Sequence, residues 1–173
     1  YWRCFDKNWS QKDFFDYGKF VDKNLIEYPQ DKINKLSNKK NKKINLGILS
    51  ADLKSGHSIT FFLKTILSNY NKDKIEVYLI SNQIDIDSIS SEIKNLVHEN
   101  IDISGLNDLN AFNKIRELNL DIIIDVMGYT SRNRIGLFKN RIAKKQALWM
   151  GYCNTTGLKN MDYIISDLNL IYK

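Results

Sequence analysis

The stretch from Leu120 to Gly157 constrains the fold of this chain more than any other. It holds two short apolar runs, 120–126 and 146–150, and each run passes directly into a loop of glycine, hydroxyl and aromatic residues. The first run is apolar except for two aspartates and does not alternate, which is typical of a parallel strand covered on both faces. Ligands of open α/β sheets bind beyond the carboxyl ends of such strands, so these two loops mark the expected site.

Apolar runs alternate with helical patterns along residues 44–173, and this alternation indicates the fold class. We expect strands at 44–50, 74–81, 101–103, 120–126, 146–150 and 163–165, and helices at 57–71, 87–98, 109–118 and 134–139. The clearest helical pattern predicts one inward face made of Ile59, Phe62, Leu63, Ile66, Leu67 and Tyr70. Strands that alternate with helices predict an α/β fold with a Rossmann-like parallel sheet and helices on both faces. Right-handed crossovers place all strand-exit loops at one edge of that sheet.

Residues 1–43 differ from the rest, and we interpret them as a helical connector and a basic linker, with 44–173 as one Rossmann-like half-domain. Aromatic residues at helical spacing predict one or two helices that pack an aromatic face on the body: Trp2, Phe5 and Trp9, then Phe14, Tyr17 and Phe20. The net charge of +6 is concentrated at this end of the chain, in a cluster of Lys39, Lys40, Lys42 and Lys43. A solvated linker explains this cluster, so we do not expect a nucleic-acid partner.

Composition and motifs exclude several classes of protein. The two cysteines, Cys4 and Cys153, form neither a disulfide framework nor a metal-binding spacing, so we expect a reduced cytoplasmic setting and no metal site. No apolar run approaches the length of a membrane span, and no signal peptide is visible. The chain begins with Tyr1 rather than Met, so we expect further residues upstream. Neither a G-x-G-x-x-G motif nor a P-loop follows the first strand, which argues against dinucleotide and P-loop sites.

Two residues at the expected edge carry chemistry. His57 follows Gly56 at the start of a helix, where the positive end of the helix dipole favours the neutral imidazole. A neutral imidazole there accepts a proton or a hydrogen bond near a reacting hydroxyl; the alternative is a helix cap or a histidine that faces solvent. Asp125 lies near the end of the central strand, and its carboxylate either accepts hydrogen bonds from loop amides or faces a ligand. Three arginines nearby are interpreted as mostly solvated, with phosphate binding as the alternative: Arg132, Arg134 and Arg141.

Several segments match the pattern of one glycosyltransferase family. The run I-N-L-G-I-L-S-A-D-L-K-S-G-H-S-I-T-F-F-L, which starts at Ile44, resembles the opening of the catalytic region in the O-linked N-acetylglucosamine transferase (SPINDLY-like) glycosyltransferases. The segments I-D-V-M-G-Y-T, R-I-G-L-F and Q-A-L-W-M-G-Y-C-N-T-T-G-L-K-N-M-D-Y-I-I-S-D follow in that family's order and spacing. The resemblance covers residues 44–167, and its most specific part is the run W-x-G-Y-x-x-T-T-G-x-x-x-M-D-Y.

The resemblance implies the N-terminal half of a GT-B glycosyltransferase. Such an enzyme transfers a sugar, expected to be N-acetylglucosamine, from a UDP-sugar to Ser or Thr hydroxyls of a protein or peptide acceptor, with inversion. The resemblance implies neither a metal nor a cofactor, because the UDP-sugar is a substrate. It also implies a C-terminal Rossmann-like half, without which we expect these residues to be inactive, and tetratricopeptide repeats before the helical connector.

The resemblance also carries roles over to individual residues. Its pattern assigns catalysis to His57 and Asp125. It assigns the loops that bind the substrate and the donor sugar to Gly128, Thr130, Met150, Gly151, Tyr152, Thr155 and Thr156.

The chain departs from the family pattern at three places. One residue is inserted before His57, both prolines of the family's R-P-A-P-x-Q segment are absent from 141–146, and the family's G-Y-P-G-T reads G-Y-C-N-T at 151–155. The last change removes a fixed turn from the sugar-facing loop, which leaves the donor sugar open. Two alternatives to the O-glycosyltransferase therefore remain: a non-catalytic Rossmann-like binding module of the same ancestry, and a relative that glucosylates asparagine in adhesins.

Overall fold

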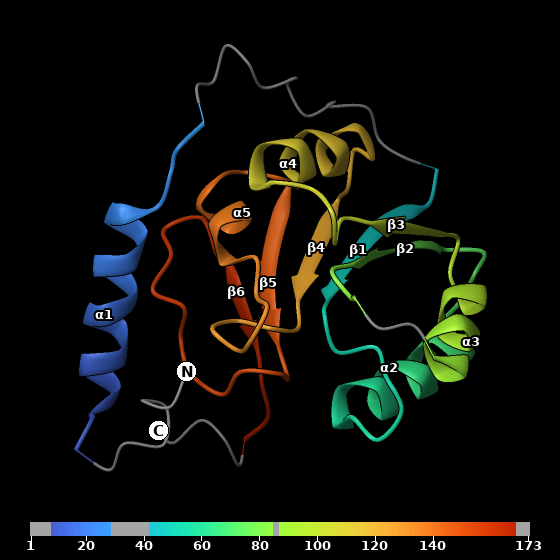
Figure 1. The fold of residues 1–173 in the computed structure, drawn as a ribbon, viewed down its shortest axis with the longest axis horizontal. Helices are drawn as coiled ribbons and strands as arrows, with labels where there is room; N and C mark the ends of the chain where they lie inside the picture. Colours follow the sequence, from blue (N-terminus) through green and yellow to red (C-terminus); the bar gives the residue numbers. More distant parts are fainter. Residues whose placement is uncertain (1–7, 29–41, 85–86, 169–173) are drawn as a thin grey trace.

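The computed structural model describes residues 8–28, 42–84 and 87–168. Trp2, Phe5, Lys39 and Lys40 lie outside the described residues. Six parallel strands form one sheet in the order β3-β2-β1-β4-β5-β6, which confirms the predicted Rossmann-like sheet (Figure 1). The strands are β1 (Ile44–Ser50), β2 (Ile75–Ser81), β3 (Glu99–Asp102), β4 (Ile122–Asp125), β5 (Lys145–Trp149) and β6 (Tyr163–Ile165). The helices are α1 (Gln11–Asn24), α2 (Ser58–Asn69), α3 (Ser88–Leu96), α4 (Asp108–Glu117) and α5 (Ile135–Lys139).

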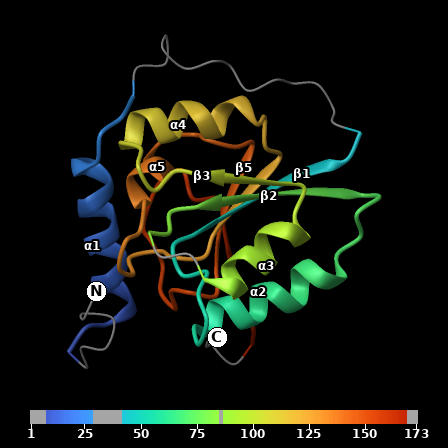
Figure 2. The ribbon, with the colours of Figure 1, turned by 45° about the vertical axis from the view of Figure 1, so that its right-hand side comes forward.

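After β3 the chain crosses back over β2 and β1, and β4 pairs with the other side of β1. This reversal decides which helices cover which face. α2 and α3 follow strands that advance from β1 to β3, and they lie side by side on one face of the sheet (Figures 1 and 2). α4 and α5 lead to strands that advance the other way, and right-handed crossovers place them on the opposite face. Buried side chains fill both layers between sheet and helices, among them Leu49, Leu63, Ile93, Phe112 and Phe138.

Polar caps determine where the helices begin. Ser10 and Asp13 form a capping box at α1, and Asp87 and Ser90 form another at α3. Asn107 caps α4 by accepting a hydrogen bond from a backbone N–H of the first turn. No helix of the described residues is both long and apolar enough to span a bilayer.

α1 packs against the body of the domain through a small residue. Gly18 is buried so closely against the carbonyl oxygen of Thr156 that a Cβ at position 18 would lie 2.2 Å from it. Phe14 is also buried, but the Phe20 side chain is 63% exposed. The prediction of one packed aromatic row is therefore wrong for Phe20 and for Tyr17, which is 45% exposed, because Phe14 and Gly18 define the face that approaches the body.

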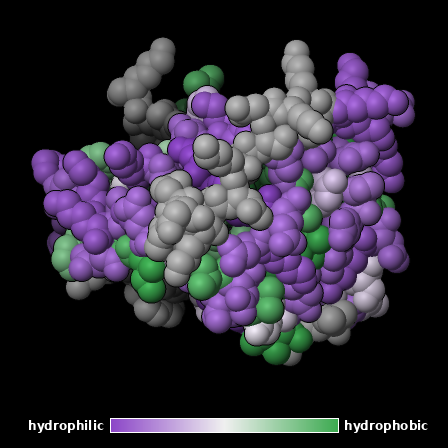
Figure 3. Space-filling model, turned by 90° about the horizontal axis from the view of Figure 1, so that it is seen from above, coloured by the Kyte–Doolittle hydropathy of each residue, from purple (hydrophilic) through white to green (hydrophobic). Residues whose placement is uncertain are grey.

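The buried face of α2 is narrower than its apolar pattern. Ile59, Leu63 and Leu67 are buried as predicted, whereas Phe62 is 49% exposed and Ile66 is 41% exposed. The predicted inward face is thus wrong for these two residues, which leave an apolar ridge on the surface. The face of the molecule seen from above, away from α2, is mostly hydrophilic where it is coloured (Figure 3).

Candidate active site

The loops after β1, β4 and β5 meet at the carboxyl edge of the sheet, where the strand order reverses. Together with the first turns of α2 they enclose a cavity of about 370 Å³. The lining comes from Asp52, His57, Ser58, Ile59, Phe62, Thr130, Ser131, Met150 and Gly151. The structure therefore brings four of the predicted site residues around one cavity: His57, Thr130, Met150 and Gly151. This is where the ligands of open α/β sheets bind.

His57 is the N-cap of α2, and its ring faces the cavity. Its Nδ1 atom accepts a hydrogen bond from the backbone N–H of Ile59 at 3.3 Å. A ring nitrogen that accepts an N–H carries no hydrogen of its own, so the hydrogen of the neutral ring lies on Nε2. The cap and the chemical role that the sequence left as alternatives are therefore compatible, because the cap uses Nδ1 and leaves Nε2 available.

Asp52 is a site residue that the sequence analysis missed. Its Oδ2 atom lies 3.6 Å from Nε2 of His57, and its side chain is 21% exposed. The signal was present, because Asp52 follows β1 directly at the predicted edge. The distance between the two side chains depends on how the loop folds back onto α2, where Thr60 donates its hydroxyl hydrogen to the carbonyl of Asp52 at 2.6 Å.

Asp125 is buried and holds the loop that follows β4. Its carboxylate accepts hydrogen bonds from the backbone N–H groups of Met127 at 2.9 Å and of Gly128 at 3.0 Å. Burial raises the pKa of Asp125 to about 7, and the two backbone hydrogen bonds oppose that shift. Of the two roles that the sequence left open, the structure shows the hydrogen bonds from loop amides, and the catalytic role stays a prediction.

Two glycines lock the loops after β4 and β5 together. Gly128 has a positive φ of 53°, and a Cβ at this position would lie 2.5 Å from the Tyr152 side chain. A Cβ on Gly151 would lie 1.7 Å from the carbonyl oxygen of Val126. Met150, beside it in the cavity wall, adopts a φ of 70°, which is rare for a residue with a side chain. Gly151 thus shapes the cavity wall through backbone contact, whereas Gly128 and Tyr152 contact each other and are not among the lining residues.

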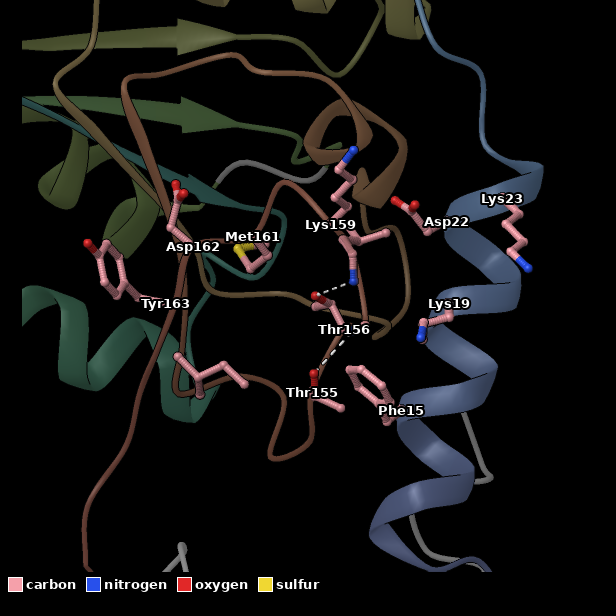
Figure 4. Close-up of a pocket in the computed structure, with 13 residues that line it drawn as sticks. Phe15, Lys19, Asp22, Lys23, Thr155, Thr156, Lys159, Met161, Asp162 and Tyr163 are labelled. Carbon is pink, nitrogen blue, oxygen red and sulfur yellow. Dashed lines mark hydrogen bonds between the residues drawn. The ribbon is translucent and has the colours of Figure 1, made fainter.

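Thr155 and Thr156 lie outside this cavity. They line a separate cavity of about 510 Å³ between α1 and the chain that leads into β6, where Phe15 and Lys19 of α1 face them (Figure 4). The Thr155 hydroxyl accepts the N–H of Gly157 at 3.1 Å. Burial raises the pKa of Tyr129, whose hydroxyl donates to the carbonyl of Thr156 at 2.7 Å. The contact of these threonines with a donor sugar stays a prediction.

Arg134 is a structural clamp, so its interpretation as a solvated side chain is wrong. The Arg134 side chain is 11% exposed, and its guanidinium forms an ion pair with Asp108 at 2.8 Å. It also donates to three acceptors in the loops after β2 and β3. Arg141 forms an ion pair with Asp162, and Arg132 is exposed as expected.

The protein-family model of glycosyl transferase family 41 matches residues 15–170, from within α1 to beyond β6. The chain belongs to glycosyl transferase family 41. This match confirms the resemblance to O-linked N-acetylglucosamine transferases and SPINDLY-like proteins. Among the described residues of this family member, no group of three His, Cys, Asp or Glu side chains could hold a metal ion.

Relatives of the family 41 chain agree with this assignment. It is 30% identical, over 128 residues, to SPINDLY of Arabidopsis thaliana, described as a probable UDP-N-acetylglucosamine–peptide N-acetylglucosaminyltransferase. It is 28% identical over 127 residues to the UDP-N-acetylglucosamine–peptide N-acetylglucosaminyltransferase of Caenorhabditis elegans. Each match covers 72% of the chain, which spans only 14% of the length of the Arabidopsis protein and 11% of the Caenorhabditis one.

A solved structure confirms the fold of the family 41 chain. A mutant of the O-GlcNAc transferase of Thermobaculum terrenum superposes with a TM-score of 0.83 at 20% sequence identity. The superposition covers 95% of the chain and 32% of that protein.

Proposed function

We propose that these residues form the acceptor-facing half of the active site in an inverting protein O-glycosyltransferase. The enzyme would transfer N-acetylglucosamine from a UDP-sugar to Ser or Thr hydroxyls. The observation that carries this proposal is His57, which faces a cavity of about 370 Å³ at the switch point of a family 41 sheet. The uridine and the diphosphate would be bound mainly by the C-terminal Rossmann-like half. The low cysteine content supports the cytoplasm as the setting.

In an inverting displacement, the acceptor oxygen forms a bond to the anomeric carbon while the bond from that carbon to the diphosphate oxygen breaks. The proton of the acceptor hydroxyl passes to the departing diphosphate. The acceptor must lie behind the carbon in line with the leaving group, so positioning contributes a large share of the rate. The neutral His57 ring has its hydrogen on Nε2 and therefore donates to the acceptor oxygen. We infer that His57 orients that oxygen in this state, beside the Asp52 carboxylate, whose Oδ2 atom lies 3.6 Å from Nε2.

The chemical role of His57 can be separated from its role as a cap. Asn is as good an N-cap as any residue, whereas Ala removes about 1 kcal/mol of stability from a capped helix. We therefore expect His57→Asn to reduce transfer by about 10²-fold while keeping the unfolding midpoint. We expect His57→Ala to reduce transfer and to lower the unfolding midpoint as well. The measurement is mass spectrometry of protein acceptors after incubation with the full-length gene product and a panel of UDP-sugars.

Each outcome of this experiment supports a different one of the three hypotheses. A single sugar mass on Ser or Thr that disappears in His57→Asn supports the proposal. Sugar on Asn-x-Ser/Thr sites would favour the asparagine-modifying relative instead. A full-length protein that neither transfers nor binds any UDP-sugar would leave the binding module as the function.

A further inference from the structure

A second cavity adjoins the first on the other side of the α2 N-terminus. Its volume is about 430 Å³, and its lining comes from Ser55, Gly56, His57, Ser58, Thr60, Phe61, Lys64 and Ile89. His57 and Ser58 line both cavities, so a molecule placed at the imidazole can extend directly into the second one.

Two consecutive aromatic residues of α2 each line one of the two cavities. Phe62 lines the cavity of His57, and Phe61 lines the second cavity. Their ring centroids lie 5.9 Å apart at an angle of 82°, and the Phe61 side chain is 72% exposed. Exposed apolar side chains that gather beside a pocket mark an interaction site more often than those scattered singly. Phe61 and Phe62 therefore each add apolar surface to one of the two adjoining cavities.

Contacts within the protein hold the wall of the second cavity, and its lysine has a partner. The backbone N–H of Ser55 donates to Asp87 at 2.7 Å, which ties the loop after β1 to the cap of α3. Lys64 forms an ion pair with Glu92 at 2.9 Å. Because the cation is paired, the cavity favours an apolar side chain over a phosphate.

We propose that the second cavity binds an apolar side chain of the acceptor polypeptide, close in sequence to the modified Ser or Thr. This inference rests on the proposed function, because it places the accepted hydroxyl at His57. An extended chain advances about 3.3 Å per residue and presents alternate side chains to the same side. The side chain two residues from the hydroxyl thus lies about 7 Å away on the same face, in the direction of Phe61 and Ile89.

The test compares two acceptor peptides that differ only in the residue two positions from the Ser, Leu in one and Gly in the other. Transfer by the full-length gene product is measured as kcat/KM for each peptide. We expect a preference for Leu of about tenfold, which corresponds to about 1.4 kcal/mol, and we expect Phe61→Ala to abolish it. Ile66→Ala is the matched control, because Ile66 is 41% exposed on the same helix but lines neither cavity.

The inference fails if the wild-type enzyme shows no preference for the Leu peptide. It also fails if Phe61→Ala retains the same preference as Ile66→Ala. It also fails if analytical ultracentrifugation shows a dimer of the wild-type protein and a monomer of Phe61→Ala. A second copy of the chain would then cover Phe61.

If no peptide is modified at all, the proposed function fails, and the cavity is judged by binding alone. Fluorescence anisotropy of the labelled Leu and Gly peptides then decides. Tighter binding of the Leu peptide that Phe61→Ala removes supports an apolar peptide subsite, and equal binding of the two peptides overturns it.

Discussion

Asp125 shows how the fold controls the ionisation of one residue. Its pKa of about 7 lies well above the ordinary value near 3.9 that it returns to in the unfolded chain. Between those two values the native state keeps a proton that the unfolded state has lost. The contribution of Asp125 to the free energy of unfolding therefore falls as the pH rises from about 4 to about 7, by at most about 1.4 kcal/mol per pH unit, and is constant above that.

An Asn at position 125 has nearly the same shape and does not titrate. Its single amide oxygen can accept from only one of the two N–H groups, of Met127 and Gly128, so we expect a loss of stability at low pH. We predict that the stability difference between the unmodified chain and Asp125→Asn shrinks as the pH rises from 4 to 7. Urea unfolding at intervals across this range measures it, and two parallel stability curves would contradict the buried, protonated carboxylate.

The sequence shows which residues can carry chemistry, but it does not show which residues they contact in the fold. Of the predicted site residues, Gly128 and Tyr152 are not among those that line the cavity, whereas these are: His57, Thr130, Met150 and Gly151. Asp52 and Arg134 could not be assigned, because their roles depend on contacts with segments that fold back from elsewhere in the chain. Thr155 and Thr156 share a motif with Gly151 but lie in a different cavity, because the chain turns away toward α1 after β5.

At the scale of elements, α1 depends on a close backbone contact. In a free helix, Gly18→Ala would be stabilising by about 1 kcal/mol, because Ala is the better helix former. Here the new Cβ would lie 2.2 Å from the carbonyl oxygen of Thr156, so we expect the opposite sign, a loss of about 1–3 kcal/mol. Chemical denaturation of the two proteins measures the difference.

Gly105 provides the matched control for this substitution. A Cβ on Gly105 would meet no atom within 4 Å, and its φ lies outside the left-handed region. Gly105→Ala should therefore change the free energy of unfolding by no more than about 0.5 kcal/mol. A Gly18→Ala protein as stable as the Gly105→Ala protein would mean that α1 does not pack on the loop at Thr156.

Local patterns predicted the elements well, since strand and helix periods are properties of consecutive residues. β1 has the predicted bounds, and α2 begins one residue after the predicted start, because His57 is the cap. The errors concern which side chains are covered: four that follow the apolar period remain exposed, namely Tyr17, Phe20, Phe62 and Ile66. Periodicity defines an apolar stripe, whereas tertiary packing decides how wide a part of that stripe is covered.

At the scale of the whole molecule, the six strands are not equally protected. β1 is paired with β2 and β4, and its last four residues are buried. Among the described residues β6 is paired with β5 alone, and its Tyr163, Ile164 and Ile165 are 43–55% exposed. Free energies of local opening are highest for core strands and lowest where few apolar contacts hold an element. We therefore predict that amides of β1 exchange hydrogen far more slowly than those of β6.

β3 separates the two causes of this difference, because it is the other edge strand but its Ile101 is 4% exposed. If edge position alone sets the protection, β3 and β6 exchange at similar rates; if apolar burial sets it, β3 is slower. We expect the second result in the 173-residue chain, measured by hydrogen exchange and mass spectrometry of peptic peptides. Protection of β6 equal to that of β1 would contradict the prediction, because exchange would then not follow the exposure of these side chains.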